Sequence, residues 1–334
     1  MCAVYGVALI VFTVAAQLLG ERPWWFALLR NFAPYYFLPL AGLIPLALLA
    51  RARRAAALLL SAGALGMAWF GGYFIPKYPP EIEPDLRVVT LNVGDFNTSL
   101  EEVAHWLQGT NADVVLLQEL PAAWATRPIN LLAESYPHQF VQSARSFKYG
   151  NAILSKHPIV QAENIHLDET DRFVQQRAVL SVHDRRVVVY NVHFEPVLGD
   201  TPRFHPTRFY SPLLWMALAY DNTRRDQQFH QVAELARGES LPTLIGGDFN
   251  TSEHASSYNT LAAVLRDSFR EVGVGLGGTW PQGGTFGTPH WLPPLLRIDY
   301  LWHNDALIAL HAEIGDPLSS DHLPLTAEYA LKRQ

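Results

Sequence analysis

The chain has 334 residues, of which 49% are hydrophobic, with a single cysteine and a formal net charge of −6. This length allows one large domain with an accessory region, and a domain of about 250 residues needs no disulfides for stability. The first 76 residues contain five arginines and one glutamate, which leaves 20 basic and 30 acidic residues, a net charge of −10, in the rest. Because a surface that binds duplex nucleic acid is normally basic, this balance weighs against a nuclease acting on long DNA. It does not weigh against an enzyme for a small or lipid-linked phosphate.

Three amino-terminal windows, residues 1–20, 31–50 and 55–76, contain no charged side chain. Each is close to the ~20 residues that cross the hydrocarbon core of a bilayer as a helix. The first window could be a signal peptide, but it has no basic segment and no small-residue cleavage site before the second window. We therefore expect a membrane region at residues 1–76, with three transmembrane helices at about 3–20, 32–50 and 55–76.

The loops between these windows indicate an orientation. Residues 51–54 read RARR, whereas the longer first loop holds Glu21, Arg22 and Arg30. Loops rich in arginine and lysine remain on the cytoplasmic side, so the second loop should be cytoplasmic, although Arg22 and Arg30 weigh against this. We expect a multi-pass cell-membrane protein in which everything after about Pro76 is extracytoplasmic.

A tether and an α/β domain follow. Residues 77–86 combine prolines with charges and cannot form the interior of a helix or sheet. The next segments are short β-branched runs such as RVVTLNV, DVVLLQEL and RRVVVYNVHF, separated by helical stretches, which is typical of buried strands in an α/β domain. We expect this domain to cover residues 87–332, with Thr98 or Ser99 capping its first helix.

Five short segments end apolar runs with residues that bind metals or move protons: LNVGDFN (91–97), LLQEL (116–120), YNVHF (190–194), GGDFN (246–250) and SDH (320–322). Strands that deliver these residues to one spot would gather hard oxygen ligands and two imidazoles. Such oxygen-rich sites suit Mg²⁺ or Mn²⁺. Phosphoester hydrolysis requires neutralisation of phosphoryl charge, an activated water and a stabilised leaving oxygen. The segments therefore predict a divalent-metal site of the kind that this reaction needs, and the family resemblance described next implies a metal-dependent phosphoesterase.

In order and spacing, these segments resemble the endonuclease/exonuclease/phosphatase superfamily, which includes deoxyribonuclease, abasic-site endonucleases, sphingomyelinases and inositol-phosphate 5-phosphatases. The resemblance covers about residues 87–329. It implies an α/β fold in which two β-sheets pack face to face between helices, a four-layer α/β/β/α sandwich with the site at one end. We expect this sandwich to follow the three transmembrane helices.

The resemblance also implies roles for single residues. Glu119 would bind Mg²⁺, with Asn92 as a second ligand or as a hydrogen-bond partner of phosphate or water. Asp321 would be an adjacent ligand or a phosphate-side acid. Asp248 would orient or deprotonate the attacking water, and Asn250 would hold a phosphate oxygen or Asp248 itself.

Two histidines complete the implied site. His193 would donate to a phosphate oxygen in the transition state, and His322 matches the second histidine, with Asp299 as its partner. An imidazole with a pKa near 6.5 needs an orienting carboxylate to keep the useful tautomer or its charge. Some nuclease relatives carry a further acid after the first asparagine, where this chain has Gly94 and then Asp95. The sequence is therefore compatible with either one or two bound metal ions.

The sequence gives weaker signals for the residues that contact the substrate than for those of the catalytic site. Arg177 would either neutralise phosphate or pair with an acid at the surface. The insertion at residues 195–226 places Arg203, His205 and Arg208 beside the apolar run FYSPLLWMALAY. This segment would either lie in a membrane interface and draw in an anionic headgroup, or form an ordinary amphipathic helix packed on the domain.

Three spans, a short tether and an outward-facing domain together resemble the VanJ-type teicoplanin-resistance membrane proteins. That resemblance implies an Mg-dependent phosphoric ester or diphosphate hydrolase that acts on a lipid-linked phosphate or pyrophosphate. The alternatives are a membrane-anchored nuclease and a phospholipase C-like or sphingomyelinase-like enzyme. A non-catalytic receptor would require the loss of site residues, and none is lost. The expected partners are the lipid bilayer and a phosphorylated substrate; duplex nucleic acid is disfavoured and no protein partner can be inferred.

Overall fold

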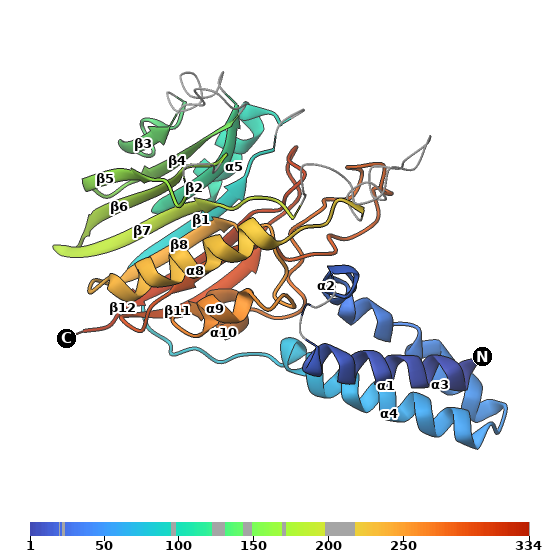
Figure 1. Cartoon of the computed structure of the whole chain (residues 1–334). Helices are drawn as coiled ribbons and strands as arrows, with labels where there is room; N and C mark the ends of the chain where they lie inside the picture. The colour runs from blue at the N-terminus through green and yellow to red at the C-terminus, as the bar shows by residue number, and fades with distance from the viewer. Residues whose placement is uncertain are drawn as a thin grey trace. The chain divides into compact units, whose positions relative to one another are not determined.

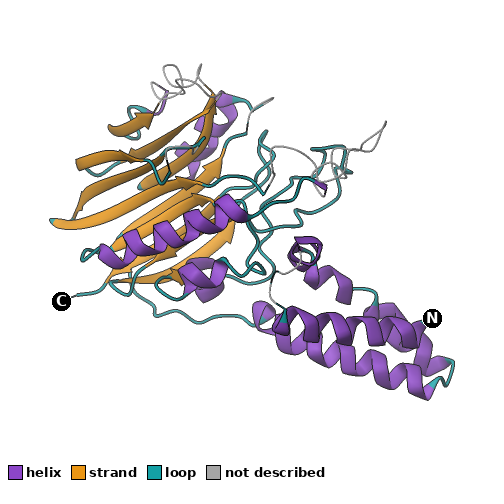
Figure 2. Cartoon of the chain, in the orientation of Figure 1, coloured by secondary structure: helices purple, strands orange, loops and turns teal. Residues whose placement is uncertain are grey.

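The computed structural model describes residues 1–19, 21, 24–94, 98–121, 131–142, 149–168, 172–197 and 218–333. The chain divides into two compact units, residues 1–75 with 253–256, and residues 76–252 with 257–334. The first unit is helical, and the second contains the β-sheets (Figure 1; Figure 2). Each unit has a hydrophobic core of its own.

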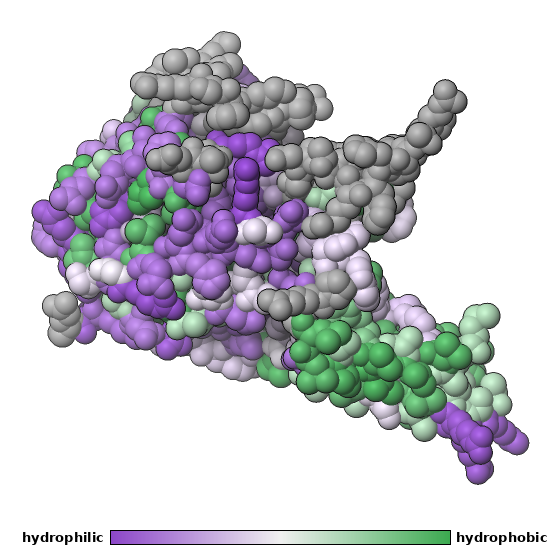
Figure 3. All heavy atoms as spheres, viewed as in Figure 1, coloured by the Kyte–Doolittle hydropathy of each residue, from purple (hydrophilic) through white to green (hydrophobic). Residues whose placement is uncertain are grey.

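The first unit is formed by short, apolar helices: α1 (Cys2–Leu18), α2 (Trp24–Asn31), η1 (Ala33–Phe37), α3 (Leu40–Leu49), α4 (Arg53–Phe70) and η2 (Gly71–Phe74). Leu9, Leu40 and Leu59 are among the residues that form its buried core. Other large apolar side chains of the same helices, such as Val11 and Met67, remain exposed. Figure 3 shows this hydrophobic surface over the helical unit. A bundle that is apolar outside as well as inside is typical of a membrane region.

The described helices support part of the expected membrane topology. The segment Arg53–Phe74 is long and apolar enough to cross a membrane. Trp24–Asn31 and Ala33–Leu49 meet the same criterion only together, and they are bent by 71° at their junction. Cys2–Leu18 is apolar but shorter. The described residues therefore contain one candidate span, or two if the bent pair counts as one, and three spans remain a prediction.

The second unit contains two mixed six-stranded sheets within the described residues. The first sheet has the order β11 (Leu307–Ile314), β12 (Leu325–Leu331), β1 (Leu86–Asn92), β2 (Val114–Pro121), β4 (Tyr149–Ser155) and β3 (His138–Gln142). The second has the order β5 (Ile159–Ile165), β6 (Gln175–Val182), β7 (Arg185–His193), β8 (Thr243–Asp248), β10 (Asp299–His303) and β9 (Arg266–Asp267). β1 is parallel to β2 and β7 is parallel to β8, while the other pairs are antiparallel.

Alternating side chains divide this unit into layers. Inward-facing residues of both sheets, such as Val88, Leu116 and Val189, form one core cluster between the sheets. On the outer face of the first sheet, α5 (Leu100–Thr110) packs against a second cluster. On the outer face of the second sheet, α8 (Thr223–Gly238) and α9 (Tyr258–Ala262) pack against a third core cluster. A short helix, α10 (Ser268–Val272), lies against β10 and β11. Two mixed sheets with flanking helices agree with the predicted α/β sandwich.

The structure shows which of the two candidate residues caps the first helix of the second unit, α5. Ser99, and not Thr98, is the N-cap of α5, because its Oγ accepts a hydrogen bond of 3.3 Å from the backbone N–H of Glu102. This bond satisfies one of the amide groups that the first turn of a helix leaves without a partner.

Candidate active site

The two parallel strand pairs end at the same edge of the sandwich and bring the predicted residues together. In the first sheet, Asn92 at the end of β1 pairs with Gln118 of β2. In the second sheet, His193 at the end of β7 pairs with Asp248 at the end of β8, and Asp248 pairs with Asp299 at the start of β10. The ends of apolar strands therefore position most of the polar groups of the site.

Glu119 reaches this site because β2 is irregular at that point. The pairing of β2 with β4 shifts between Leu117 and Leu120, and Glu119 has a left-handed φ of 54°. In a regular strand, Gln118 and Glu119 would point to opposite faces. Here both contact groups at the sheet interface, since Gln118 Nε2 donates to Asn191 and Glu119 Oε1 accepts from Asn92.

The glycines of GGDFN allow β8 to lie close to β7. Gly247 has a φ of 144°, and a Cβ on it would lie 1.8 Å from the carbonyl oxygen of Val192. No other residue fits this position without a shift of the backbone. The close approach places Asp248 directly beside His193 of the neighbouring strand.

Asn92 connects the two carboxylates at the centre of the site. Its Nδ2 lies 3.1 Å from Glu119 Oε1 and 3.0 Å from Asp248 Oδ2, and its Oδ1 accepts from the backbone N–H of Gly94. Asn250 holds the other side of Asp248: its backbone N–H donates to Oδ1 at 2.8 Å, and its Nδ2 lies 3.3 Å from Oδ2. In this arrangement Asn92 and Asn250 are both hydrogen-bond donors that orient carboxylates.

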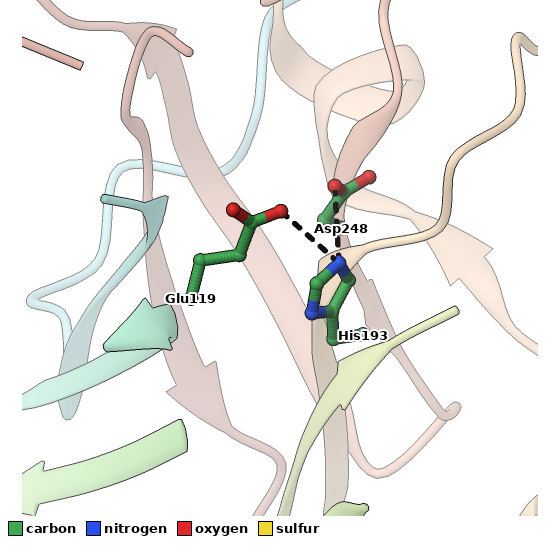
Figure 4. A group of neighbouring side chains, drawn as sticks. All are labelled: Glu119, His193 and Asp248. Atoms are coloured by element: carbon green, nitrogen blue, oxygen red, sulfur yellow. Dashed lines mark ion pairs between the residues drawn. The ribbon is translucent and has the colours of Figure 1, made fainter. Parts of the chain in front are cut away.

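His193 lies between Glu119 and Asp248 (Figure 4). Its Nε2 is 3.5 Å from Glu119 Oε1 and 3.8 Å from Asp248 Oδ2. The ring is buried, and Phe173 packs on it with ring centroids 3.7 Å apart. Burial, together with the charges of His322 and Arg172, lowers the pKa of His193 to about 3, so the ring is neutral at pH 7.

His322 is the charged histidine of the site. Its Nδ1 lies 2.9 Å from Asp299 Oδ2, and both side chains are buried. Burial alone would lower the pKa of His322, but the charge and hydrogen bond of Asp299, with Asp248 nearby, outweigh it and raise that pKa. The imidazole is therefore protonated at neutral pH, with its Nε2 3.9 Å from Asp248 Oδ2.

Asp248 combines deep burial with close neighbours of both signs. Burial raises the pKa of its carboxyl group above the ordinary range, and Asp299 adds to the rise. His322 and the donors Asn250 and Asn92 act in the opposite direction. A carboxyl group whose pKa lies closer to neutrality is suited to accept or release a proton during a reaction.

The described residues include a donor set that fits a divalent cation. Glu119, His193 and Asp248 each offer one ligand atom, and these atoms lie within 4.8 Å of one another. The carboxylate oxygens of Glu119 and Asp248 suit Mg²⁺ or Mn²⁺, whereas an imidazole nitrogen is a ligand that transition metals prefer. Asp321 lies outside this group: its Oδ2 accepts from Trp280 Nε1 at 3.1 Å, and its Oδ1 would be 2.6 Å from a Cβ on Gly94.

The structure does not bring every predicted residue to the site. Arg177 lies on the outer face of β6, opposite the inward-facing Gln176, where its guanidinium binds Glu239 at 2.7 Å and Glu163 at 3.1 Å. The alternation of side chains along the strand turns it away from His193, so of the two roles expected for Arg177 the structure shows the pairing with an acid and not the contact with substrate. The other three predicted substrate contacts, Arg203, His205 and Arg208, lie outside the described residues.

A buried polar layer beneath the site was missed by the sequence analysis. Gln118 Nε2 donates to Asn191 Oδ1 at 2.7 Å across the sheet interface. Asn191 Nδ2 in turn donates to the carbonyls of Leu117 and Ala152 and to Gln176 Oε1. The available signal was spacing, because Asn191 precedes His193 by two residues in YNVHF and must share its face.

A family model described as Endonuclease/Exonuclease/phosphatase family matches residues 89–322, a span that contains the whole cluster from Asn92 to His322. The chain belongs to the endonuclease/exonuclease/phosphatase family. Members of this family hydrolyse phosphate esters and depend on divalent metals, and the carboxylates and imidazoles described above can bind one. No curated protein matches the chain.

Solved structures of endonuclease/exonuclease/phosphatase proteins share the fold. A family protein from Bacteroides vulgatus has a TM-score of 0.57 at 16% identity, over 74% of this chain and 99% of its own. A mannosyl-6-phosphatase from Bacteroides thetaiotaomicron has a TM-score of 0.54 at 16% identity, over 74% of this chain and 100% of its own. A humanized TDP2 from D. rerio has a TM-score of 0.55 at 19% identity, over 73% of this chain and 98% of its own. These similarities support the fold and leave the substrate open.

Proposed function

We propose that this protein is a membrane-anchored, Mg-dependent phosphoesterase of the VanJ-like kind, which hydrolyses a lipid-linked phosphate or pyrophosphate outside the cytoplasm. The hydrolytic part rests on the joined carboxylates of Glu119 and Asp248 beside the His322–Asp299 pair, in a family of phosphoesterases. The membrane part rests on the apolar helices and on the charge of the second unit.

The charges of the site fit the hydrolysis of a phosphoester. Glu119 is the member of the donor set whose side chain remains 23% exposed, so it would hold the cation at the open side of the site. A bound divalent cation would supply positive charge for the phosphoryl oxygens and would make a water more acidic. His322, protonated and held by Asp299, would donate a hydrogen bond to a phosphoryl or leaving oxygen.

Asp248 is the group that would take the proton of the attacking water. It is buried, and its two oxygens are held by the side chain of Asn92 and by both donors of Asn250, so its direction is fixed before substrate arrives. His193 is neutral because of its burial and would donate one hydrogen bond to the phosphate without carrying charge. Phe173 keeps its ring in place.

The lipid-linked substrate is inferred from the rest of the chain. The helices of residues 1–75 expose large apolar side chains, which favours contact with lipid. Residues 77–334 carry a net charge of −10, which disfavours a duplex. The tether at residues 77–86 can span at most about 3.3 Å per residue when it is fully extended. It would therefore keep the active site close to the bilayer surface.

Activity is tested with the full-length protein purified in detergent. Release of inorganic phosphate is measured with Mg²⁺ and then with EDTA, on undecaprenyl pyrophosphate, plasmid DNA and sphingomyelin, with His322→Ala as the inactive control. Turnover of the prenyl pyrophosphate alone, lost with EDTA and in the variant, supports the proposal. Nicked plasmid without phosphate release would favour a nuclease, and cleaved sphingomyelin a phospholipase C-like enzyme.

Topology is tested separately by cysteine labelling, which is practical because the sole native cysteine, Cys2, can be replaced. In a Cys2→Ser background, one variant carries Tyr78→Cys in the tether, where the native side chain is 91% exposed, and another carries Ala52→Cys in the arginine-rich loop. A membrane-impermeant maleimide should label residue 78 in intact cells and residue 52 only after lysis. The reverse pattern would place the catalytic domain in the cytoplasm.

A further inference from the structure

A buried glutamate near the site holds an arginine that the sequence analysis did not single out. The side chain of Glu195 is 1% exposed, and it makes two hydrogen bonds and one further ion-pair contact with Arg172, each of 2.7 Å. The backbone N–H of Arg172 reaches Oε1, and its Nε and Nη2 reach Oε2. Gln228 fixes the same segment from α8 by accepting the backbone N–H of Glu195. The guanidinium is therefore fixed at both its backbone and its side chain.

The residues that follow Arg172 in the chain contact His193 directly. Phe173, the next residue, packs on the imidazole of His193. Gln175 accepts from the backbone N–H of His193 at 2.7 Å and donates to its carbonyl at 3.0 Å. Glu195 itself follows His193 by two residues. Arg172 thus lies at the active site.

Arg172 is also open to solvent on one side. Its side chain is 41% exposed, although its partner is buried. Glu195 engages two of the five N–H groups that a guanidinium offers, so other N–H groups can face an incoming ligand. Arg225 also contacts a site residue, through the carbonyl of Asn250, but its side chain is 1% exposed and bonded to Asp226. It therefore cannot reach a substrate.

A further cation suits the charges of the site, in addition to the protonated His322 and a bound metal ion. Glu119, Asp248, Asp299 and Asp321 are all acidic, and a phosphate adds further negative charge. We propose that Arg172 binds the non-bridging oxygens of the substrate phosphate next to His193, and that the buried Glu195 positions it. A guanidinium fork matches two phosphate oxygens, and a buried carboxylate holds it in place before binding. This assignment rests on the proposed phosphoesterase function, and it gives Arg172 the phosphate contact that was one of the two roles expected for Arg177.

The test measures binding of inorganic phosphate to the full-length protein in detergent with Mg²⁺, by calorimetry, so that no turnover is needed. Arg172→Ala should weaken phosphate binding about tenfold or more, and Arg172→Lys, which keeps the charge without the fork, should lie in between. Glu195→Gln should also lie in between, because the guanidinium loses its charged anchor. Arg266→Gln is the matched control, since Arg266 is exposed and pairs with Asp305.

Each outcome has a defined meaning. A phosphate affinity of Arg172→Ala equal to that of the native protein would overturn the proposal, as would an equal loss in the Arg266→Gln control or no saturable binding by the native protein. Arg172→Lys keeps the test valid if the alanine variant fails to fold. A native protein that binds phosphate through Arg172 but hydrolyses no phosphoester would contradict the proposed function and leave the binding role in place.

Discussion

Asn92 at the end of β1 donates a hydrogen bond of 3.0 Å to Asp248 at the end of β8, and this bond crosses from one sheet of the sandwich to the other. The two residues are 156 positions apart in the chain. The same Nδ2 also lies 3.1 Å from Glu119 Oε1. One neutral amide thus keeps two carboxylates from different sheets close together, and the geometry of the site depends on the assembly of both sheets.

The first prediction concerns this amide. Asn92→Ala removes a donor from both carboxylates, which would then repel each other and move apart, so we expect kcat to fall by about 10²-fold or more. Phosphate release from the best substrate measures the effect, and Asn259→Ala on the exposed side of α9 is the control. An Asn92→Ala variant with native kcat would show that the bridge has no role in catalysis.

The second prediction concerns the carboxylate behind His322. Asp299→Asn keeps the shape of the side chain but removes the charge that raises the pKa of His322, so the imidazole loses its proton more readily and donates less well. We expect kcat to fall by about 10²-fold to 10⁴-fold with a small change in KM, measured by steady-state kinetics. Asp305→Asn at the exposed pair with Arg266 is the control, and an equal loss there would contradict this role.

A third prediction concerns the stability contributed by Glu239. Its carboxylate binds Arg177 at 2.7 Å and Tyr190 Oη at 2.6 Å. Burial would raise the pKa of Glu239, but these two partners outweigh it and lower the pKa below the ordinary value of 4.5. A group whose pKa is lower in the folded state stabilises it above the unfolded pKa, and this stabilisation is lost as the pH falls through the folded pKa.

Glu239→Gln should therefore lower the free energy of unfolding by about 2 kcal/mol at pH 7. The difference from the native protein should shrink as the pH falls below 4.5, because the native carboxylate then takes up a proton. Denaturant unfolding at several pH values measures this, with the exposed Glu134→Gln as control. A difference that does not change with pH would show that charge is not the cause.

The fourth prediction concerns the polar layer beneath the site. Asn191→Ala leaves the carbonyls of Leu117 and Ala152 and the side chain of Gln176 without their donor in a fully buried place. We expect a loss of about 3 kcal/mol in the free energy of unfolding, because unsatisfied buried polar groups are costly. Chemical denaturation checks this against Asn259→Ala, which should change stability by less than about 0.5 kcal/mol.

The fifth prediction concerns the cation. If Glu119 holds Mg²⁺ at this cluster, saturating Mg²⁺ should raise the melting temperature of the full-length protein, and EDTA should reverse the rise. Binding at 100 times the dissociation constant stabilises a fold by about 2.7 kcal/mol. Glu119→Gln should remove most of this shift, measured by differential scanning fluorimetry. A Glu119→Gln variant with the native shift would place the cation elsewhere.

The positions of the site residues along the chain could be predicted because each follows a buried strand. Asn92, His193 and Asp248 end apolar runs, and the parallel pairing of those strands gathers their ends at one edge. Such signals are local, since alternation and strand ends can be identified within a few residues. The two-sheet sandwich was implied by the resemblance to the endonuclease/exonuclease/phosphatase superfamily, and the described sheets agree with it.

The sequence by itself determined which chemical groups meet at the site, because apolar runs followed by Asn, Glu, His and Asp define both the strands and their ends. Only the tertiary structure decided which way those groups face. The bulge turns Glu119 inward, the outer face of β6 carries Arg177 to Glu239, and Glu195 holds Arg172 beside His193. These contacts depend on strand register and on partners distant in the chain, and a change of one residue in register reverses the face of every side chain.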